Sequence, residues 1–389
     1  MAQTVTLAIV GCGGMAGAHR KGLERLWEAG LRDFEIVATC DVAQERAQKM
    51  AEEVEKMQGK RPRAYVELGD LLEKEKDLLA VDICTVHRNH HNLAAQCFEA
   101  KKHVTIEKPL ALTLRAGRAM LKAAEKAGTV FQVAENYRRS PENRAIKWAI
   151  SQGMIGKLRM VYWIDVGERL WYWKWREHKQ ESGGGWSLDG GVHFADLMRY
   201  HVGEVKRMYA EVKAFQPFRY QDRERMEGQV PVDVEDTTMA VLEFENGALG
   251  QWTHTSAAPG QEFSRRVIYG EGGSIDFSEG LKTRAASGQQ TLKELVAGHQ
   301  RSIGEEEKER LFPRGVTDTV ATELWEFLEA VRGKGKVEID GWEGFKSQAV
   351  CEALYESAAV GGPVTLGAVE ALEVENYQRQ LNESLGLPR

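Results

Sequence analysis

The sequence has little that would direct the protein to a membrane, to nucleic acid or to an oxidising compartment. Only five of its 389 residues are cysteine, and no pair of them has the spacing of a metal site. No apolar run approaches the roughly 20 residues that a membrane span requires, and residues 1–6 lack the basic and long apolar segments of a secretory signal. The formal net charge of −6 argues against a nucleic-acid or anionic-membrane partner. We therefore expect a reduced, cytoplasmic protein.

The chain is too long for a typical single domain, which predicts two domains or one domain with a large insertion. Residues 4–10 form a short apolar run, typical of a strand buried on both faces. A G-x-G-x-x-A dinucleotide fingerprint follows directly and leads into a helical pattern. The first glycine permits a tight turn, the second lets the backbone approach a pyrophosphate, and the alanine permits close packing. An ordinary glycine turn is the alternative, but the flanking strand and helix favour nucleotide binding. The residues of the fingerprint are Gly11, Cys12, Gly13, Gly14, Met15 and Ala16.

Asp41 directly follows the second predicted strand, residues 34–40. A carboxylate at this position can accept hydrogen bonds from the adenine ribose and would repel a 2′-phosphate, so it favours NAD over NADP. The alternative is a helix N-cap for the residues that follow. Arg46 is close enough in sequence that NADP remains possible.

Strands and helices alternate up to residue 134, which predicts a doubly wound parallel sheet. Ligands of such sheets bind beyond the carboxyl ends of the strands. We therefore place His87, Glu107 and Lys108, each just past a strand, at the cofactor, together with Val86 and His91. A metal is not expected at residues 87–91, because no acid or thiol accompanies these histidines. Beyond the strands already named, we expect strands at 64–66, 81–86, 103–106 and 130–134, and helices at 43–58, 90–101 and 113–127.

Beyond residue 134 the alternation stops and long strands predominate. The dipeptide Asn246-Gly247 predicts a hairpin between residues 237–244 and 248–255. We expect residues 1–134 to form the nucleotide-binding domain and residues 135–389 an α/β domain with a large, mainly antiparallel open sheet. Helices at about 317–332 and 341–360, with a short one near 373–384, should close the chain. We expect these C-terminal helices, the one at 341–360 in particular, to pack back on the first domain. The charged segments 219–236 and 283–316 are interpreted as loops.

The expected open sheet carries apolar side chains on both faces, for example Met239, Val241 and Leu242. Such a sheet needs its second face covered. The pattern therefore predicts a homo-oligomer, a dimer or a tetramer, that associates through this sheet.

A glycine-rich stretch, residues 183–191, turns into a helical pattern at Asp189. Asp189, His193 and Asp196 then stand at i, i+4 and i+7, on one helical face. Such a face can serve proton transfer, metal binding or capping. The preceding segment, residues 168–176, is rich in tryptophan and cations, which suits either carbohydrate stacking or loop packing. The candidates for carbohydrate contact are Trp171, Trp173 and Trp175.

Four motifs, in this order and separation, resemble those of the Gfo/Idh/MocA family of NAD(P)-dependent oxidoreductases. They are the fingerprint at 11–16, Glu107-Lys108-Pro109-Leu110, Tyr137-Arg138 with Gly153-Met154-Ile155-Gly156, and residues 184–196. The resemblance implies a Rossmann domain, an α/β domain and a cleft between them for cofactor and a sugar or polyol. By motif match, Lys108 is the active-site lysine, Asp189 the substrate-binding acid and His193 the catalytic histidine. Tyr137, Arg138 and Trp175 complete the expected substrate site.

This resemblance implies hydride transfer between NAD(P) and the CH–OH group of a sugar, polyol or anhydrosugar. A histidine titrates near neutral pH and suits the role of base, while a lysine ammonium stabilises a developing alkoxide. Asp196 is interpreted as structural, and no metal is expected, although ligation by Asp189, His193 and Asp196 is the rival interpretation. An NAD-retaining glycosidase that oxidises transiently, or a non-enzymatic sensor, are the alternative functions.

Overall fold

The computed structural model describes residues 4–285 and 288–387, which form two compact units. Unit 1 combines the chain up to residue 112 with residues 116–140 and 305–345. Unit 2 contains residues 113–115, 141–304 and the chain from residue 346 onward. The outermost residues of the predicted domains, 1–3 and 388–389, lie outside the described residues, as do 286–287. The predicted boundary between residues 134 and 135 stays a prediction.

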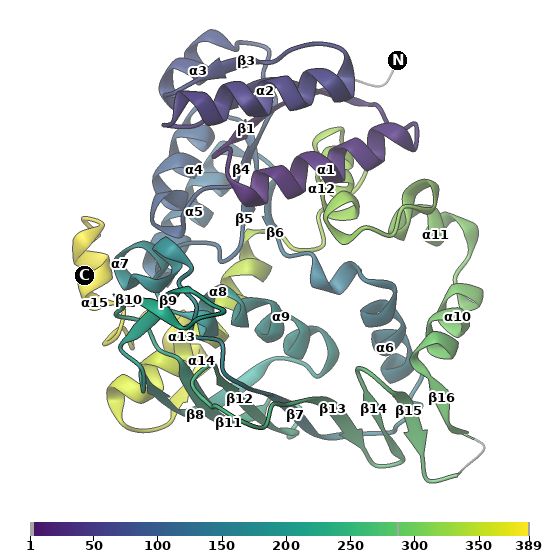
Figure 1. The fold of residues 1–389 in the computed structure, drawn as a ribbon. Coiled ribbons are helices and arrows are strands. Elements are labelled where there is room, and N and C mark those ends of the chain that lie inside the picture. The colour runs from purple at the N-terminus through teal and green to yellow at the C-terminus, as the bar shows by residue number, and fades with distance from the viewer. Residues whose placement is uncertain (1–3, 286–287, 388–389) are drawn as a thin grey trace. The chain divides into compact units, whose positions relative to one another are not determined.

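Unit 1 contains a six-stranded parallel sheet with the order β3-β2-β1-β4-β5-β6 (Figure 1). The chain starts in the middle of the sheet, where Leu7 pairs with Ile36 on one side and Ala80 on the other. The predicted doubly wound parallel sheet is thereby confirmed. Its strands are β1 (Val5–Val10), β2 (Phe34–Cys40), β3 (Arg63–Tyr65), β4 (Ala80–Ile83), β5 (His103–Glu107) and β6 (Phe131–Ala134). The helices between them are α1 (Gly14–Glu28), α2 (Gln44–Gln58), α3 (Leu68–Lys74), α4 (His90–Glu99) and α5 (Leu114–Ala127).

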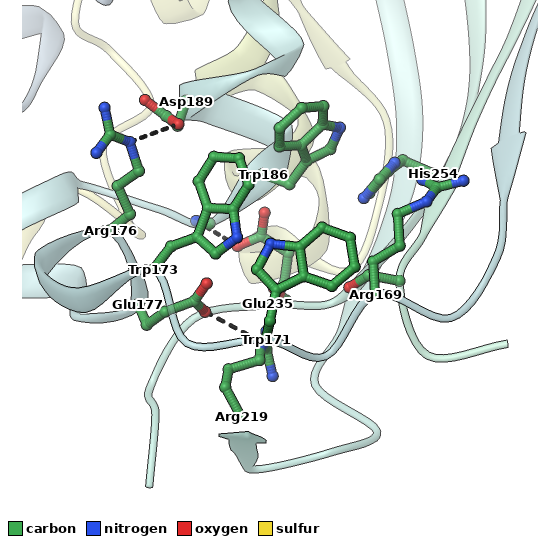
Figure 2. A pocket seen from close by; sticks show the side chains of 12 residues that line it. Arg169, Trp171, Trp173, Arg176, Glu177, Trp186, Asp189, Arg219, Glu235 and His254 are labelled. Atoms are coloured by element: carbon green, nitrogen blue, oxygen red, sulfur yellow. Dashed lines mark hydrogen bonds and ion pairs between the residues drawn. The ribbon is translucent and has the colours of Figure 1, made fainter. Parts of the chain in front are cut away.

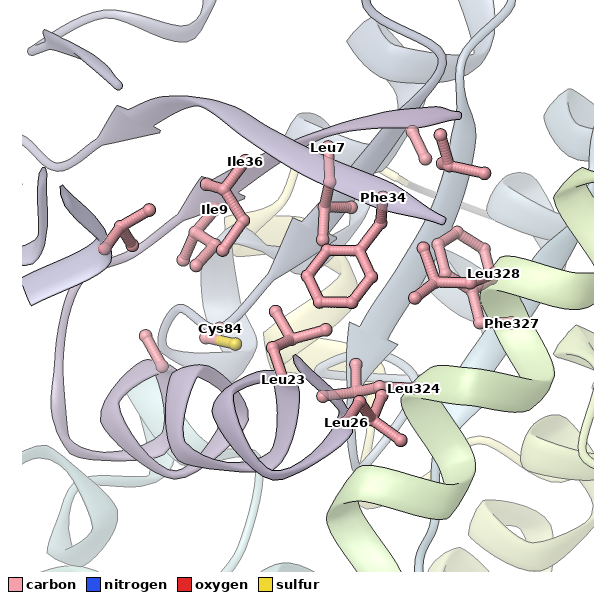
Figure 3. Close-up of a cluster of buried hydrophobic side chains, with 14 of the residues drawn as sticks. Leu7, Ile9, Leu23, Leu26, Phe34, Ile36, Cys84, Leu324, Phe327 and Leu328 are labelled. Carbon is pink, nitrogen blue, oxygen red and sulfur yellow. The ribbon is translucent and has the colours of Figure 1, made fainter. Parts of the chain in front are cut away.

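The core of unit 1 lies between the sheet and two helices that are far apart in sequence. Helix α12 (Thr319–Val331) contributes Leu324, Phe327 and Leu328 to the cluster that β1, β2 and α1 build (Figure 3). Helix α1 approaches α12 closely because residue 22 is glycine. A Cβ atom on Gly22 would lie 3.1 Å from the backbone nitrogen of Ala321.

Unit 2 is built on a nine-stranded sheet with the order β16-β15-β14-β13-β7-β12-β11-β8-β17. Among the described strand pairs of this sheet, β7 with β12 is parallel and the others are antiparallel. The predicted large, mainly antiparallel sheet is thereby confirmed. The strands are β7 (Leu158–Val166), β8 (Val205–Lys213), β11 (Thr237–Phe244), β12 (Leu249–Thr255), β13 (Phe263–Gly270), β14 (Gly273–Asp276), β15 (Gly280–Thr283), β16 (Gln290–Thr291) and β17 (Val364–Thr365).

Helices cover one face of this sheet. Phe194 of α9 (Gly191–His201) packs on Trp163 of β7, with ring centroids 5.2 Å apart. Ser357 of α13 (Gly341–Val360) accepts a hydrogen bond from the Ala210 backbone nitrogen of β8 at 2.9 Å. The opposite face carries exposed apolar side chains, which include Met160, Tyr209, Met239, Val241 and Leu249.

Several elements differ from the expectations. The predicted loop 219–236 contains a hairpin of β9 (Phe218–Asp222) and β10 (Glu227–Pro231), and 283–316 contains α10 (Leu292–Ser302) and α11 (Glu305–Leu311). Helix α10 begins with a capping box, in which the Thr291 hydroxyl accepts from the Glu294 backbone nitrogen. The other α-helices of the described residues are α6 (Pro141–Ser151), α7 (Lys179–Ser182), α8 (Trp186–Asp189), α14 (Leu366–Glu370) and α15 (Arg379–Ser384). None of the helices in the described part of the chain has the length and apolar composition that a membrane crossing requires.

Candidate functional site

The fingerprint loop has the geometry of a phosphate-binding turn. Gly11 has a φ of +86°, and a Cβ atom there would lie 2.7 Å from the carbonyl oxygen of Cys84, so only glycine fits. By contrast, apart from adjoining residues and the backbone of the same helix, no heavy atom in the described part of the chain lies within 4 Å of a Cβ atom built on Gly13 or Gly14. Helix α1 starts here, and no side chain caps it. The open space beside uncapped backbone N–H groups fits the pyrophosphate of a dinucleotide.

The other residues of the fingerprint hold the loop on the core. Cys12 and Ala16 belong to the buried cluster of unit 1, and Met15 packs against it. Burial raises the pKa of Cys12 to about 12, so its side chain is a neutral thiol at physiological pH. These three residues therefore serve packing, while the glycines leave room for a ligand.

Asp41 ties the fingerprint loop to the end of β2. Its carboxylate is buried and accepts hydrogen bonds from the backbone nitrogens of Cys12 and Ala43, both at 2.8 Å. Helix α2 has Ala43 as its N-cap residue and no side-chain cap, so Asp41 does not act as a conventional N-cap. Each carboxylate oxygen can accept a further hydrogen bond, which leaves capacity for a ribose hydroxyl. Arg46 is exposed on α2.

Glu107, at the end of β5, faces a buried ionic network. Its Oε1 lies 2.9 Å from Nε2 of His19, and its Oε2 accepts from the backbone nitrogen of Lys108 at 3.1 Å. The Nδ1 of His19 lies 2.9 Å from a carboxylate oxygen of Asp82. Burial alone would lower the pKa of His19, but the Asp82 carboxylate, with further groups, raises it well above the usual value. His19, whose protonated form this environment favours, therefore bridges the carboxylates of Asp82 and Glu107, the second of which directly precedes Lys108 in the chain.

This network was missed in the sequence, where His19 is simply one residue of a helix. Ligand atoms of His19, Asp82 and Cys84 also lie within 4.8 Å of one another, close enough to share a metal ion. The two ring nitrogens of His19 each contact a carboxylate oxygen instead, which is the arrangement of a bridging imidazolium. The absence of a metal stays a prediction.

The histidines after β4 are packed into unit 1. His87 is buried, with its ring 5.7 Å from that of His90. Burial lowers the pKa of His90 to about 4, and its Nδ1 lies 3.1 Å from the carbonyl oxygen of Pro109. Burial also lowers the pKa of His91, whereas Val86 is half-buried. His90 thus joins the segment after β4 to the segment that carries Lys108, although it was not among the predicted site residues.

The predicted substrate residues of the segment after β6 also lie in unit 1. The exposed fraction of Tyr137 is 38%, and its backbone nitrogen donates to the Glu135 carboxylate at 3.0 Å. Arg138 is buried and makes an ion pair with Glu343 at 3.2 Å. Tyr137 is therefore the more accessible of the two.

The glycine-rich stretch forms two short helices, joined at Gly190, whose backbone is itself in the right-handed helical region. Helix α8 ends at Asp189 and α9 begins at Gly191. Asp189 is buried and accepts from the Arg176 Nε at 3.0 Å, while Asp196 accepts from the Ser347 hydroxyl at 2.8 Å. His193 lies half-buried on the first turn of α9.

The glycines of this stretch pack against the protein's own groups. A Cβ atom would lie 2.4 Å from the Tyr355 hydroxyl at Gly184 and 2.7 Å from the Glu235 carbonyl oxygen at Gly185. The Glu235 carboxylate accepts from the backbone nitrogens of Gly185 and Ser187 and from the Tyr355 hydroxyl, at 2.8 to 2.9 Å. Glu235 therefore holds the start of α8. No motif around Glu235 indicates this role in the sequence.

A pocket lies wholly within unit 2, next to Asp189 (Figure 2). Two of the predicted carbohydrate-contact residues, Trp171 and Trp173, line it. Trp175 is not among its lining residues, and the Arg176 guanidinium stacks on the Trp175 ring at 4.4 Å from the centroid. The full lining is Arg169, Trp171, Trp173, Arg176, Glu177, Gly185, Trp186, Asp189, Arg219, Glu235, His254 and Ser256.

Two family models match this chain almost end to end. Residues 5–135 match the NAD-binding Rossmann fold of the Gfo/Idh/MocA oxidoreductase family, and residues 147–366 match its C-terminal alpha/beta domain. The chain belongs to this family. The family resemblance inferred from the motifs is thereby confirmed, and the match over residues 5–135 supports NAD as the cofactor.

Characterised relatives of the family are similar over most of the chain. The levoglucosan dehydrogenase of Pseudarthrobacter phenanthrenivorans is 31% identical over 317 residues, 73% of this chain and 79% of that protein. The myo-inositol 2-dehydrogenase of Thermotoga maritima is 30% identical over 277 residues, 68% of this chain and 70% of that protein. The solved structure of a levoglucosan dehydrogenase in complex with NADH is 25% identical, with a TM-score of 0.73 over 94% of this chain and 99% of that chain.

Proposed function

We propose that the protein is an NAD-dependent dehydrogenase that oxidises the CH–OH group of a sugar, polyol or anhydrosugar. The observation that carries this proposal is membership of the oxidoreductase family across both of its domains. The fingerprint loop supports it, because the space beside Gly13 and Gly14 and the uncapped start of α1 fit a dinucleotide. The related proteins are named dehydrogenases of levoglucosan and myo-inositol, which favours net oxidation over the glycosidase and sensor alternatives.

Three residues of the family motifs are the proposed catalytic residues. His193, on the first turn of α9, would take the hydroxyl proton as general base, since an imidazole titrates near neutral pH. The Lys108 ammonium would stabilise the alkoxide as that proton leaves. Asp189, whose carboxylate already binds Arg176, would accept a hydrogen bond from a second hydroxyl of the substrate.

NAD, when bound, accepts the hydride from the alcohol carbon, and the carbon–oxygen bond becomes a carbonyl. The protein's own residues position the reacting groups and move one proton. Gly11 and Asp41 fix the fingerprint loop, so the N–H groups at the start of α1 present a fixed anion site. The buried His19 network fixes Glu107, and with it the backbone that carries Lys108.

A parallel screen of sugars, polyols and anhydrosugars against NAD and NADP tests the proposal. We expect absorbance of the reduced nicotinamide to rise with at least one carbohydrate, and NAD to be used in preference to NADP. Absence of any signal across a wide panel, with protein shown to bind NADH, would refute the dehydrogenase assignment. Cleavage of a glycoside without net NADH would support the glycosidase instead.

We further propose that the protein is a cytoplasmic homo-oligomer. The exposed apolar side chains of Met239, Val241 and Leu249 on the face of the sheet that is opposite α9 support association. The five cysteines are free and buried, in keeping with a reducing compartment. Light scattering coupled to size exclusion should give a mass above that of one chain, and Val241→Lys should lower it.

A further inference from the structure

The pocket of unit 2 has the size of a site for one sugar ring. It lies between the tryptophan-rich segment 168–177, the start of α8 and the end of β12. Its volume is about 170 Å³, room for on the order of ten water molecules. This space is comparable to a single pyranose ring.

The walls of the pocket are mainly aromatic. The rings of Trp171 and Trp173 lie 6.2 Å apart, and Trp186 meets Trp173 edge-on at 6.3 Å. His254 lies beside Trp186 at 5.4 Å, with the two ring planes inclined by 31°. Figure 2 shows the three indole rings grouped around the pocket. Indole faces suit the apolar C–H face of a sugar ring, because they bury it without needing hydrogen bonds.

Each guanidinium group that lines the pocket is already paired with a carboxylate. Arg169 makes a bidentate pair with Asp165 at 2.8 and 2.9 Å. Arg176 pairs with Asp189 at 3.0 Å, and Arg219 pairs with Glu177 at 3.0 Å (Figure 2). A ligand carboxylate or phosphate would therefore have to displace a carboxylate of the protein to reach any of these guanidinium groups. The pocket consequently favours an uncharged occupant.

Two polar atoms of residues that line the pocket are buried behind its wall. His254 is 5% exposed, and its Nε2 has no hydrogen-bond partner within the described parts of the chain. The Nε1–H of Trp186 is buried and, in the same parts of the chain, also lacks an acceptor. Almost none of the surface of either atom can be reached by a water molecule, so these two groups do not contact an occupant of the pocket.

We propose that this pocket binds a second, uncharged sugar ring, so that the preferred substrates are neutral glycosides or oligosaccharides rather than free monosaccharides. Asp189, which we place at the substrate, lines the pocket, whereas His193 and Lys108 do not. The ring in the pocket is therefore next to the oxidised ring and is not itself oxidised. This inference rests on the proposed function, in which His193 and Lys108 act at the reacting carbon.

Kinetics with matched substrates test the second ring. For a hexose that the enzyme oxidises, kcat/KM is measured with the free hexose, its neutral disaccharides and a disaccharide whose second ring is a uronic acid. We expect kcat/KM for the best neutral disaccharide to be about tenfold or more above kcat/KM for the free hexose and for the charged disaccharide. Trp173→Ala should abolish this preference, and Trp173→Phe should retain part of it. Trp342→Ala is the control, because Trp342 is partly exposed in unit 1, where it donates to Glu125.

The outcomes separate this proposal from the proposed function. Three outcomes would overturn the second-ring site while leaving the dehydrogenase assignment intact. They are an equal kcat/KM for hexose and disaccharides, an equal loss of kcat/KM for both in Trp173→Ala, and a higher kcat/KM for the charged disaccharide. If no carbohydrate yields NADH, the proposed function fails. Calorimetry then measures the binding of the neutral disaccharides and tests the pocket independently of activity. Binding that Trp173→Ala weakens about tenfold supports the pocket, and binding that is absent or unaffected by Trp173→Ala overturns it.

Discussion

Replacing His19 by alanine is expected to destabilise unit 1 strongly. The His19 ring is fully buried, and its two nitrogens lie 2.9 Å from carboxylate oxygens of Asp82 and Glu107. Removing one member of a buried ion pair costs about 3–5 kcal/mol, because the remaining charge is left uncompensated. Since each kcal/mol shifts Tm by roughly 2–4 °C in a unit of this size, Tm should fall by about 6–20 °C.

The same network predicts how stability depends on pH. The pKa of His19 is raised in the folded protein above its unfolded value of about 6.5. A raised pKa means that folding favours the protonated form. The stabilisation is therefore present in full below about pH 6.5 and is lost as the pH rises through the folded pKa. The neutral variant His19→Gln lacks this contribution, so the Tm difference between wild type and variant should shrink on the alkaline side.

Thermal unfolding followed by circular dichroism measures both effects. Lys21→Ala is the matched control, because Lys21 is exposed on the same helix. A surface substitution of this kind changes stability by about 0.5 kcal/mol or less. The account of the network would be refuted if His19→Ala lowered Tm no more than Lys21→Ala does. It would also be refuted if the difference between wild type and His19→Gln did not depend on pH.

Three further predictions concern the site. Lys108→Ala and His193→Asn should each lower kcat by about 10²–10⁴, and His193→Asn should do so while NADH affinity, measured by fluorescence titration, is retained; unchanged turnover would contradict their assigned roles. Asp41→Ala should raise KM for NAD by about tenfold or more, because the fingerprint loop loses its acceptor. Exposed Lys49, on α2, supplies the control Lys49→Ala, and equal KM values would argue against the role of Asp41. Glu235→Ala should cost about 3 kcal/mol in thermal unfolding, since three hydrogen bonds to a buried carboxylate are lost; a change no larger than that of Glu235→Gln would contradict this estimate.

The parts of the fold that follow from short-range pattern were predictable from the sequence. The apolar runs of β1 and β4 and the glycines after β1 indicated a nucleotide-binding sheet. The Asn246-Gly247 turn predicted the hairpin of β11 and β12, and Gly247 has the positive φ, +84°, that such a turn requires. Helix α10 could also have been found, because Thr291 and Glu294 form a capping box, but its charged neighbours concealed the helical period.

The remaining parts of the site depend on contacts between residues far apart in sequence. Glu235 holds Gly185 and Ser187 across about 50 residues, and it also binds Tyr355, 120 residues further on. His254 reaches the pocket from β12 and has no motif around it. No periodicity or local composition reports such pairings, because they arise when separate elements pack together.

Transfer of deuterium from substrate to cofactor tests the central claim most directly. The protein is incubated with NAD and a neutral disaccharide or sugar deuterated at successive carbinol carbons, and the reduced nicotinamide is analysed by mass spectrometry. The account predicts that deuterium from one carbon appears in the nicotinamide ring, and that His193→Asn forms this product far more slowly. Reduced nicotinamide without deuterium from any labelled carbon, or no reduced nicotinamide with any carbohydrate, would contradict it.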